Sequence, residues 1–500
     1  MKKILLILAV LTLPLAVFSQ NSRVLYFMDL PQNRNLNPAF KPSDSVNIAL
    51  PASGFAFSFN NNFINFSDII KTGKSDSLIT FLHPDFGTDK FLDGIRRKNS
   101  FDLDFMMQIF SLGFNVGRDG YVFFDFNEKF QGRTAIPGDL FKLALKGNEA
   151  FAGDYIDFSA SKFKFQYYHE AGLGYSRNIN SRLRAGIKAK LLLGLVSANF
   201  DNNSLGIRIG ENYSHLFDAD ASMNLSGPFT ITRDSDGNIE DIESDDKQFR
   251  NTMLLKGPKN IGTALDAGVT YILNPKIVLS AAVTDFGLIR WKNGVSNLKT
   301  KNQFEFNGID MTDVINGDKT FEEAGEDLLD SIKDTFSPDV LHVPYTTFTP
   351  ASLNLAGSYQ FTRNLRFGLL STSRFMGRQV KESLTASANV NLGSSLLASV
   401  SYTASNHRFD NFGAGLALRL SIFQFYIMSD RIPVFWNKIY TDSNENNRTD
   451  GNFVVLPANW NTLDLRFGMN LVFGHRKKKA VIDACGYEEE PGVDPEKLKQ

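Results

Sequence analysis

The last long alternating segment of the chain, residues 463–473, constrains the fold more than any other feature. Its odd positions are all apolar, from Leu463 through Phe467 to Phe473, while the even positions are Asp, Arg, Gly, Asn and Val. Successive side chains of a strand point to opposite faces, so this segment predicts a β-strand with one apolar and one mostly polar face. Such a strand suits the core of a soluble sandwich, and it equally suits a barrel with lipid outside and water inside.

Residues 1–19 have the organisation of a cleaved export signal. Lys2 and Lys3 precede an apolar stretch at residues 4–17, and Ser19 provides a small residue before the predicted mature start at Gln20. The apolar stretch is short for a membrane span, and no cysteine follows the cleavage site, which argues against a lipid anchor. With no other run of about 18 apolar residues and a mean hydropathy of -0.17, a helical inner-membrane protein is excluded.

Charge and cysteine content exclude two further classes. The chain has 53 basic and 54 acidic residues, a formal net charge of -1, so it lacks the basic footprint of a nucleic-acid-binding protein. Cys485 is the only cysteine, so no intrachain disulfide can form despite the expected export. Among the aromatic residues, 45 Phe against 14 Tyr and 3 Trp favour a β-rich or lipid-facing use of the rings.

Period-two alternation recurs along the chain, which predicts strands rather than helices. Paired segments meet at short turns: 163–175 with 183–195, 261–273 with 277–291, and 384–392 with 396–402. Further strands are expected at 45–59, 101–116, 121–130, 205–225 (as one strand or two), 353–361, 365–375, 412–420, 423–428 and 463–473. A closed barrel with both termini on the inner side needs an even number. We therefore predict an all-β fold, a transmembrane antiparallel barrel of about 14 (14–16) strands.

The connections alternate between short turns and long polar segments, which is typical of outer-membrane barrels. The long ones are expected at 60–100, 228–260, 292–346 and 431–461. Within the third, Thr320 and Glu323 form a capping box that predicts a short helix ending before Pro338. The expected organisation is an export signal at 1–19, an N-terminal segment at 20–44, a barrel at 45–473 and a polar, flexible periplasmic tail at 474–500.

Asn37-Pro38-Ala39-Phe40 resembles the Asn-Pro-Ala motif in the N-terminal hatch of the long-chain fatty-acid transporter family of outer-membrane barrels. Residues 264–271 and 279–291 are similar to Asp-x-Gly-x-x-Tyr and Asp-x-Gly-x-x-x-Trp strands of related Bacteroidota barrels. Some of those barrels are of unknown function, and others belong to a protein secretion and gliding system. The resemblance implies that residues 20–44 form a hatch carrying the motif, in a barrel with long extracellular loops.

Two departures limit what this resemblance implies. Barrels of the family commonly end at the aromatic residue of the last strand, whereas residues 474–500 follow Phe473 here. No substrate-pocket motif of the fatty-acid transporters matches position by position. The resemblance therefore implies the fold more than the cargo, which would be a small hydrophobic molecule.

Polar side chains on the face opposite the apolar one are the candidate lumen-lining residues. They are Lys164, Glu170, Arg184, Lys188, Lys190, Asp266, Arg419 and Arg466. Two interpretations stay open. These side chains either solvate the interior and contact a plug, as in ordinary barrels, or select anionic head groups.

Motifs for metal binding and catalysis are weak. Asp442, Asn444, Asn446 and Asp450 resemble the opening of a calcium loop, but the sixth position lacks Gly and the twelfth is Phe453 instead of Glu. Residues 68–75 end like a phosphate-binding loop without its first Gly, and the six histidines are scattered. We therefore expect no metal, no cofactor and no enzyme activity.

The leading hypothesis is an exported barrel in the outer membrane of a Gram-negative cell, in contact with lipid and active as a channel or transporter for small hydrophobic molecules. Lipid offers no hydrogen bonds to the backbone, so alternating strands can span it only in a closed ring. One alternative is a non-transporting scaffold that binds a partner in protein secretion or surface assembly. Another is a soluble, secreted array of β-sandwiches.

Overall fold

The computed structural model describes residues 23–474 with gaps. The gaps are 52, 73–77, 84, 86, 212–213, 236–237, 255, 257–259, 307–330, 332–333, 378, 394, 406–407, 434–435, 441–452 and 458–460. The expected export signal, residues 475–500 of the tail, most of the helix expected before Pro338 and the calcium-like loop lie outside the described residues. No described helix is long and apolar enough to cross a membrane.

Fourteen antiparallel strands close into a transmembrane barrel, within the range that the sequence predicted. In order around the ring they are β1 (Val46–Ala49) continued by β2 (Gly54–Asn61), β5 (Lys98–Val116), β6 (Gly120–Pro137), β8 (Lys162–Asn178), β9 (Leu183–Ile209), β13 (Asn260–Asn274), β14 (Ile277–Trp291), β18 (Ala351–Gln360), β19 (Leu365–Met376), β20 (Gln379–Leu392), β21 (Leu396–Ser405), β22 (Arg408–Leu420), β23 (Phe423–Ile432) and β26 (Thr462–Phe473). The last strand, β26, pairs with β1 and β2 and thereby closes the ring. Closure pairs the backbone of every wall strand, as lipid requires.

The two faces of each strand follow the alternation in the sequence. On β9 the side chain of Ile187 is 50% exposed on the outside of the wall, whereas that of Lys188 is 0% exposed inside it. On β26 Phe467 is exposed and Asn470 is buried. The closed ring with an apolar outside excludes the soluble sandwich array, because a sandwich would bury these apolar faces.

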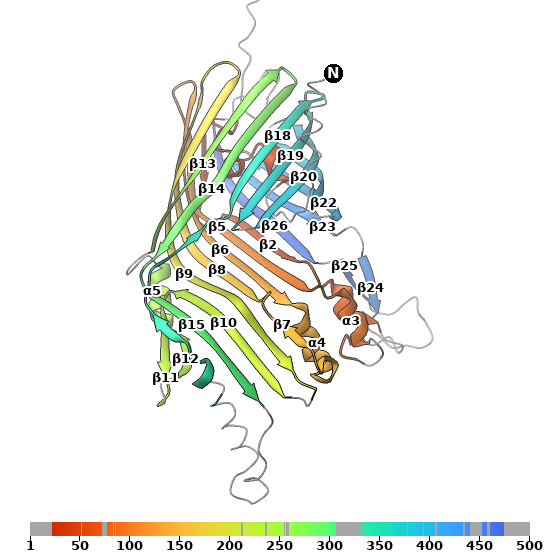
Figure 1. Ribbon diagram of the computed structural model, residues 1–500. Coiled ribbons are helices and arrows are strands. Elements are labelled where there is room, and N and C mark those ends of the chain that lie inside the picture. Colours follow the sequence, from red (N-terminus) through yellow and green to blue (C-terminus); the bar gives the residue numbers. More distant parts are fainter. Residues whose placement is uncertain are drawn as a thin grey trace, which may run out of the picture.

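The two ends of the barrel differ. Six of the connections are tight turns at one end, and the long connections leave the other end (Figure 1). Outer-membrane barrels have short periplasmic turns and longer extracellular loops, so we assign the end with the tight turns to the periplasm. The long connections carry α2 (Phe66–Ile69), β3 (Ile70–Thr72), β4 (Leu78–Thr80), α3 (Thr88–Gly94), α4 (Gly138–Lys146), η3 (Glu149–Phe151), β7 (Tyr155–Asp157), β11 (Phe229–Arg233), β12 (Ile239–Ser244), α5 (Asp246–Met253), β17 (Tyr345–Phe348), β24 (Trp436–Tyr440) and β25 (Phe453–Pro457).

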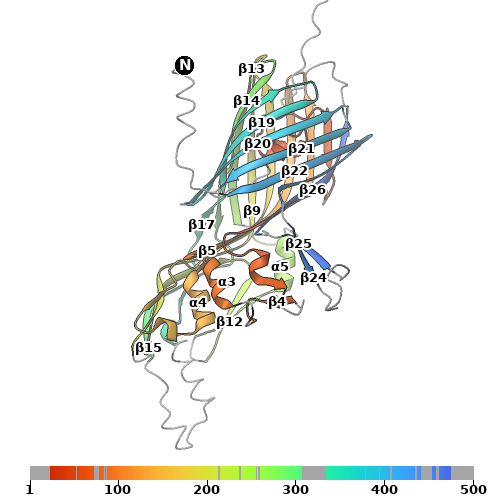
Figure 2. The same cartoon turned by 90° about the vertical axis from the view of Figure 1, so that its right-hand side faces the viewer.

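Several strands continue far beyond the ring, and this continuation of the same sheet is here called the outer sheet (Figure 2). It consists of the second half of β9 with β10 (His215–Ser226), β15 (Val295–Phe306) and β16 (Asp339–Leu341). β9 is 27 residues long, whereas a tilted spanning strand needs about 9 to 11. The expectation that residues 205–225 belong to the barrel is therefore wrong: β13 starts opposite Gly194, so the rest of β9 has no barrel neighbour on that side and pairs with β10 instead.

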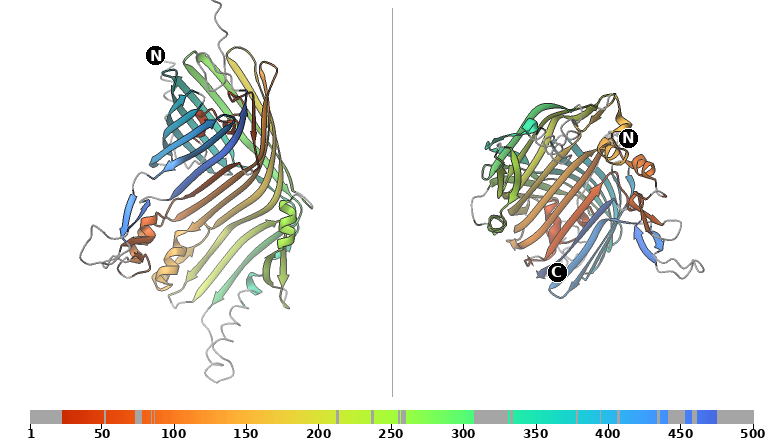
Figure 3. Two further views of the ribbon diagram at one scale, coloured as in Figure 1. Left: turned by 180° about the vertical axis from the view of Figure 1, so that it is seen from behind. Right: turned by 90° about the horizontal axis from the view of Figure 1, so that it is seen from below.

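The N-terminal segment, residues 23–44, lies inside the ring and contains η1 (Leu25–Phe27) and η2 (Pro31–Asn35). Its residues are coloured red in Figure 1, and the view from below in Figure 3 shows the strands surrounding the interior. We call this segment the hatch. Its apolar side chains pack with one side of the wall into a cluster that comprises Val24, Leu25, Tyr26, Phe27, Met28, Leu30, Leu36, Phe40, Leu370, Ala417, Tyr426 and Met428.

Candidate functional site in the barrel interior

The polar face of β9 supplies lysines to the interior because its neighbour β8 provides room for them. Lys188 lies beside Gly174 and Lys190 beside Gly172 in the β8–β9 ladder. A Cβ on Gly172 would overlap the Lys188 side chain. The Gly-x-Gly sequence of β8 therefore lets two long cationic side chains lie against the wall.

These lysines belong to a charged wall that consists of Asp125, Lys129, Glu170, Lys188, Lys190, Asp266 and Asp285. Lys188 Nζ lies 3.0 Å from Asp125, and Lys190 Nζ lies 2.7 Å from both Asp266 and Asp285. Lys129 Nζ lies 2.6 Å from Glu170 and 3.2 Å from Asp285. Five of these charges are buried, Lys129 and Asp285 are half-buried, and each has a partner of opposite sign that offsets the cost of burial.

Asp285 joins this wall through a β-bulge in β14. The register of β13 and β14 shifts at this point, and Asp285 adopts a positive φ of 57°. Its backbone N–H donates to Asp266 Oδ1 at 2.7 Å, and its carbonyl accepts a hydrogen bond from the Thr349 hydroxyl at 2.6 Å. Bulges redirect side chains, and this one turns the Asp285 carboxylate toward two lysines.

The hatch is fastened to the wall by Arg34, whose side chain is completely buried. Its guanidinium donates to Asp125 at 2.8 Å, to Asn47 at 2.9 Å and to the Tyr121 hydroxyl at 3.1 Å, and it also contacts Ser111. Sequence reasoning missed Arg34, because nothing in the sequence distinguishes it from the other two cations of residues 23–44, Arg23 and Lys41.

The Asn-Pro-Ala motif forms a bend that packs on two glycines. Asn37 Oδ1 accepts a hydrogen bond from the Ala39 N–H at 2.9 Å, and its Nδ2 donates to the Val269 carbonyl at 3.3 Å. Gly186 and Gly268 face each other in the β9–β13 ladder directly beneath it. A Cβ on either glycine would overlap Pro38 or Asn37. The motif can therefore pack this closely on the wall only because both positions lack a side chain.

A cavity of about 120 Å³ lies between the hatch and the extracellular part of the interior. It is bounded by the hatch residues Leu25, Gln32, Asn35 and Leu36 and by both charged and apolar parts of the wall. The charged residues that line it are Asp104, Lys129, Glu170, Lys190, Asp285, Arg374, Asp464 and Arg466.

Sequence reasoning also missed a second group of charges, two of which, Asp104 and Arg374, line this cavity. Arg133 and Arg374 hold Asp104 with distances of 2.7 and 3.1 Å, and Lys381 contacts Asp102. The five residues come from four strands, β5, β6, β19 and β20, so only their register brings them together.

The candidate lumen-lining residues fall into three places. Glu170, Lys188, Lys190 and Asp266 meet in the charged wall, and Arg466 borders the cavity. Arg184 and Arg419 lie at the periplasmic end, where they bind Asn178 at 2.7 Å and Asp44 at 2.5 Å, respectively. Lys164 is exposed near the start of β8, beyond the cavity.

The calcium-like residues Asp442, Asn444, Asn446 and Asp450 all lie outside the described residues. In the part of the chain that the structure describes, no three His, Cys, Asp or Glu side chains gather into a possible metal site.

The fold and interior define an outer-membrane β-barrel with an internal N-terminal hatch. The chain belongs to the family DUF5723, a family of unknown function, whose model matches residues 38–430. No curated protein matches the chain in sequence.

Solved structures with a similar course of the chain are distant in sequence. A Pseudomonas aeruginosa FadL homologue is 10% identical with a TM-score of 0.42, over 93% of this chain and all of that one. The P. putida toluene transporter TodX is 9% identical with a TM-score of 0.35, over 93% and 99% of the two chains. The Ralstonia pickettii toluene transporter TbuX is 7% identical with a TM-score of 0.33, over 92% and 99%.

Proposed function

We propose that this protein is an outer-membrane channel for small molecules whose lumen is closed by the hatch. The observation that supports this most directly is the arrangement of the interior. The hatch is joined covalently to the wall only where the chain continues into β1. Polar contacts such as those of Arg34 with Asp125, Asn37 with Val269 and Val24 with Asp430 hold it inside the ring. On its extracellular side lies a cavity that is large enough for a small solute.

The chemical class of the transported molecule is the part of this proposal that an experiment has to determine. The hydrophobic cargo expected from the sequence has support from the apolar cluster of the hatch, on one side of the interior. The other side of the interior carries the charged wall, and the cavity borders both. A test of the channel therefore needs a hydrophobic and a polar probe.

The channel is tested by loosening the hatch without touching the barrel. Pro38 restricts its own φ and the conformation of Asn37, so Pro38→Gly frees the bend of the motif. We expect the variant, and a deletion of residues 34–40, to assemble with a normal heat-modifiable gel mobility and to raise the permeability of reconstituted vesicles to one of the two probes.

Pro275→Gly is the matched control, because Pro275 is exposed in the periplasmic turn between β13 and β14. It should leave permeability unchanged. Intact barrels with a disrupted hatch and no change for either probe would contradict the channel.

A second candidate function is a scaffold in protein secretion or surface assembly. The observation that favours it is the outer sheet, which extends beyond the ring although a pore does not require it. Two results together would support the scaffold instead. A variant without residues 475–500 would lose a cross-linked partner, and the hatch variants would leave permeability unchanged.

A further inference from the structure

The cavity on the extracellular side of the hatch has one wall built from small side chains. On β2 the inward positions are Gly54, Ala56 and Ser58, and they pair with Gly468, Arg466 and Asp464 of β26. Tyr426 of β23 fills the space above the two glycines. Arg466 is thus the largest group on this patch of the wall, and its cross-strand neighbours on either side are Ala56 and Met428.

Most charges that line the cavity are already neutralised by protein partners. Lys129 and Lys190 contact Asp285 and Glu170, and Arg374 contacts Asp104. These pairs leave little free charge for a solute on their side of the cavity.

Arg466 differs from these cations. Among the described residues its guanidinium makes no ion pair and no hydrogen bond, and its Nε is buried without a partner. Asp464, two residues earlier on the same face, interacts electrostatically with Arg466 without forming an ion pair, and it accepts a hydrogen bond from the backbone N–H of Asp430 at 3.3 Å. A buried donor without an acceptor costs free energy, which an anion arriving from the cavity would recover.

We propose that Arg466 is the anion subsite of this cavity and that the cavity binds a small polar solute through a carboxylate. The planar guanidinium offers parallel N–H donors that match the two oxygens of a carboxylate. The inference rests on the proposed channel function and adds to it the chemical class of the solute.

The remaining lining combines amide groups with apolar side chains such as Phe55, Phe105 and Phe130, so the small volume, rather than the polarity of the lining, limits the solute. Beside Arg466 the cavity presents the amides of Gln32, Gln108, Asn127 and Gln131. Its volume of about 120 Å³ is below the roughly 150 Å³ of an engineered cavity that holds benzene. A molecule of a few heavy atoms with several polar groups fits these limits, whereas a long alkyl chain does not.

The proposal is tested by calorimetric titration of the folded, detergent-solubilised full-length protein with succinate. Its uncharged isostere succinamide and the apolar-tailed carboxylate hexanoate serve as comparison probes. We expect succinate to bind, hexanoate to bind more weakly, and succinamide to bind not at all. Arg466→Gln should weaken succinate binding by at least about tenfold, because charge-assisted hydrogen bonds are lost.

Arg363→Gln is the matched control, since it removes an exposed cation of the turn between β18 and β19. It should bind succinate like the unmodified protein, and heat-modifiable mobility verifies that each variant is folded. Equal binding by Arg466→Gln, no succinate binding, or tighter binding of hexanoate or succinamide would each overturn the proposal. Titration reports binding whether or not the solute crosses the membrane, so a failure of the channel and a failure of the subsite remain distinguishable.

Discussion

At the scale of single residues, polar groups in the interior pair with partners that are distant in the sequence. Arg34 and Asp125 are 91 positions apart, yet their side chains are both buried and 2.8 Å apart. The ring of Phe123 lies 5.0 Å from the Arg34 guanidinium carbon and adds a cation–π contact. Arg34 is therefore a buried polar attachment of the hatch, beside the contacts of Arg23 with Asp430 and of Gln32 with Asn470.

Replacing Arg34 with Met should release the hatch while the barrel still assembles. Breaking a buried ion pair costs up to about 3 to 5 kcal/mol, and Asp125 keeps Lys188 as a partner at 3.0 Å. We expect a lower temperature for the heat-induced gel-mobility shift and new trypsin cleavage at Arg23 or Lys41. Arg363→Met is the control. An unchanged transition temperature with a protected hatch would show that Arg34 does not hold it.

At the scale of elements, the period-two pattern determines which face of each strand meets lipid. The same pattern led to the pairing of 163–175 with 183–195 and of 261–273 with 277–291, and the structure has both hairpins. The pattern gave the wrong location for residues 205–225. Alternation predicts a strand with two different faces, but it does not predict which strands lie beside it. Both the barrel wall and the outer sheet satisfy the pattern.

The two faces of β9 should respond differently to substitution. Ile187→Arg places a charge in lipid near the midplane, at a cost of roughly 2 to 4 kcal/mol, and should impair assembly. Lys188→Gln should still assemble, since Asp125 keeps its contact with Arg34. The yield of heat-modifiable barrel in outer-membrane fractions measures both. Equal yields for the two variants would contradict the assignment of the faces.

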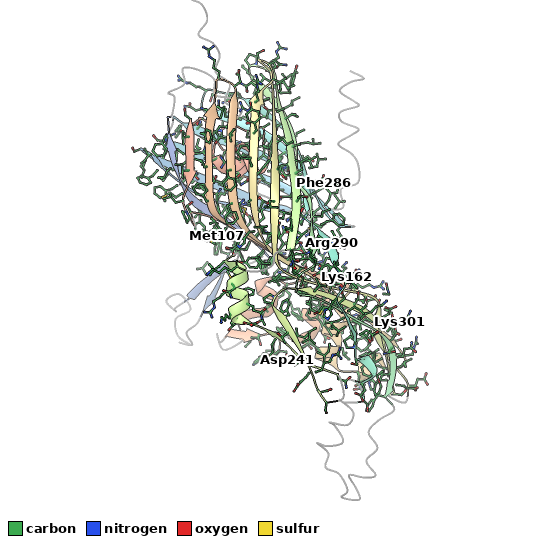
Figure 4. The ribbon with its side chains drawn as sticks, turned by 90° about the vertical axis from the view of Figure 1, so that its left-hand side faces the viewer. Met107, Lys162, Asp241, Phe286, Arg290 and Lys301 are labelled. Carbon is green, nitrogen blue, oxygen red and sulfur yellow. The ribbon has the colours of Figure 1, made fainter. Side chains whose placement is uncertain are left out.

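At the scale of the whole molecule, the barrel and the outer sheet form one continuous β-structure that extends to one side of the membrane. In Figure 4, Phe286 lies on the barrel wall, while Arg290, Lys162 and Lys301 follow toward the outer sheet. Phe286 is 69% exposed and apolar, which suits lipid, and the three cations mark the change to a polar surface. The outer sheet is therefore expected to project from the cell surface.

Surface labelling tests this orientation. In a Cys485→Ser background, Lys301→Cys should react with a membrane-impermeant maleimide in intact cells, because its side chain is 76% exposed on the outer sheet. Arg363→Cys, in a periplasmic turn, should react only after the outer membrane is opened. The reverse pattern would invert the topology assigned here.

The sequence by itself determined the class of fold, because alternation and the lack of a long hydrophobic run after the predicted export signal are local properties. It also pointed to the Asn-Pro-Ala motif and to the polar face of β9, since both are contiguous in the chain. The tertiary structure decided which charges meet. The pairs Arg34–Asp125 and Lys190–Asp285 and the position of Arg466 beside the cavity all depend on strand register and hatch position. These depend on contacts between distant segments, which periodicity within one segment does not encode.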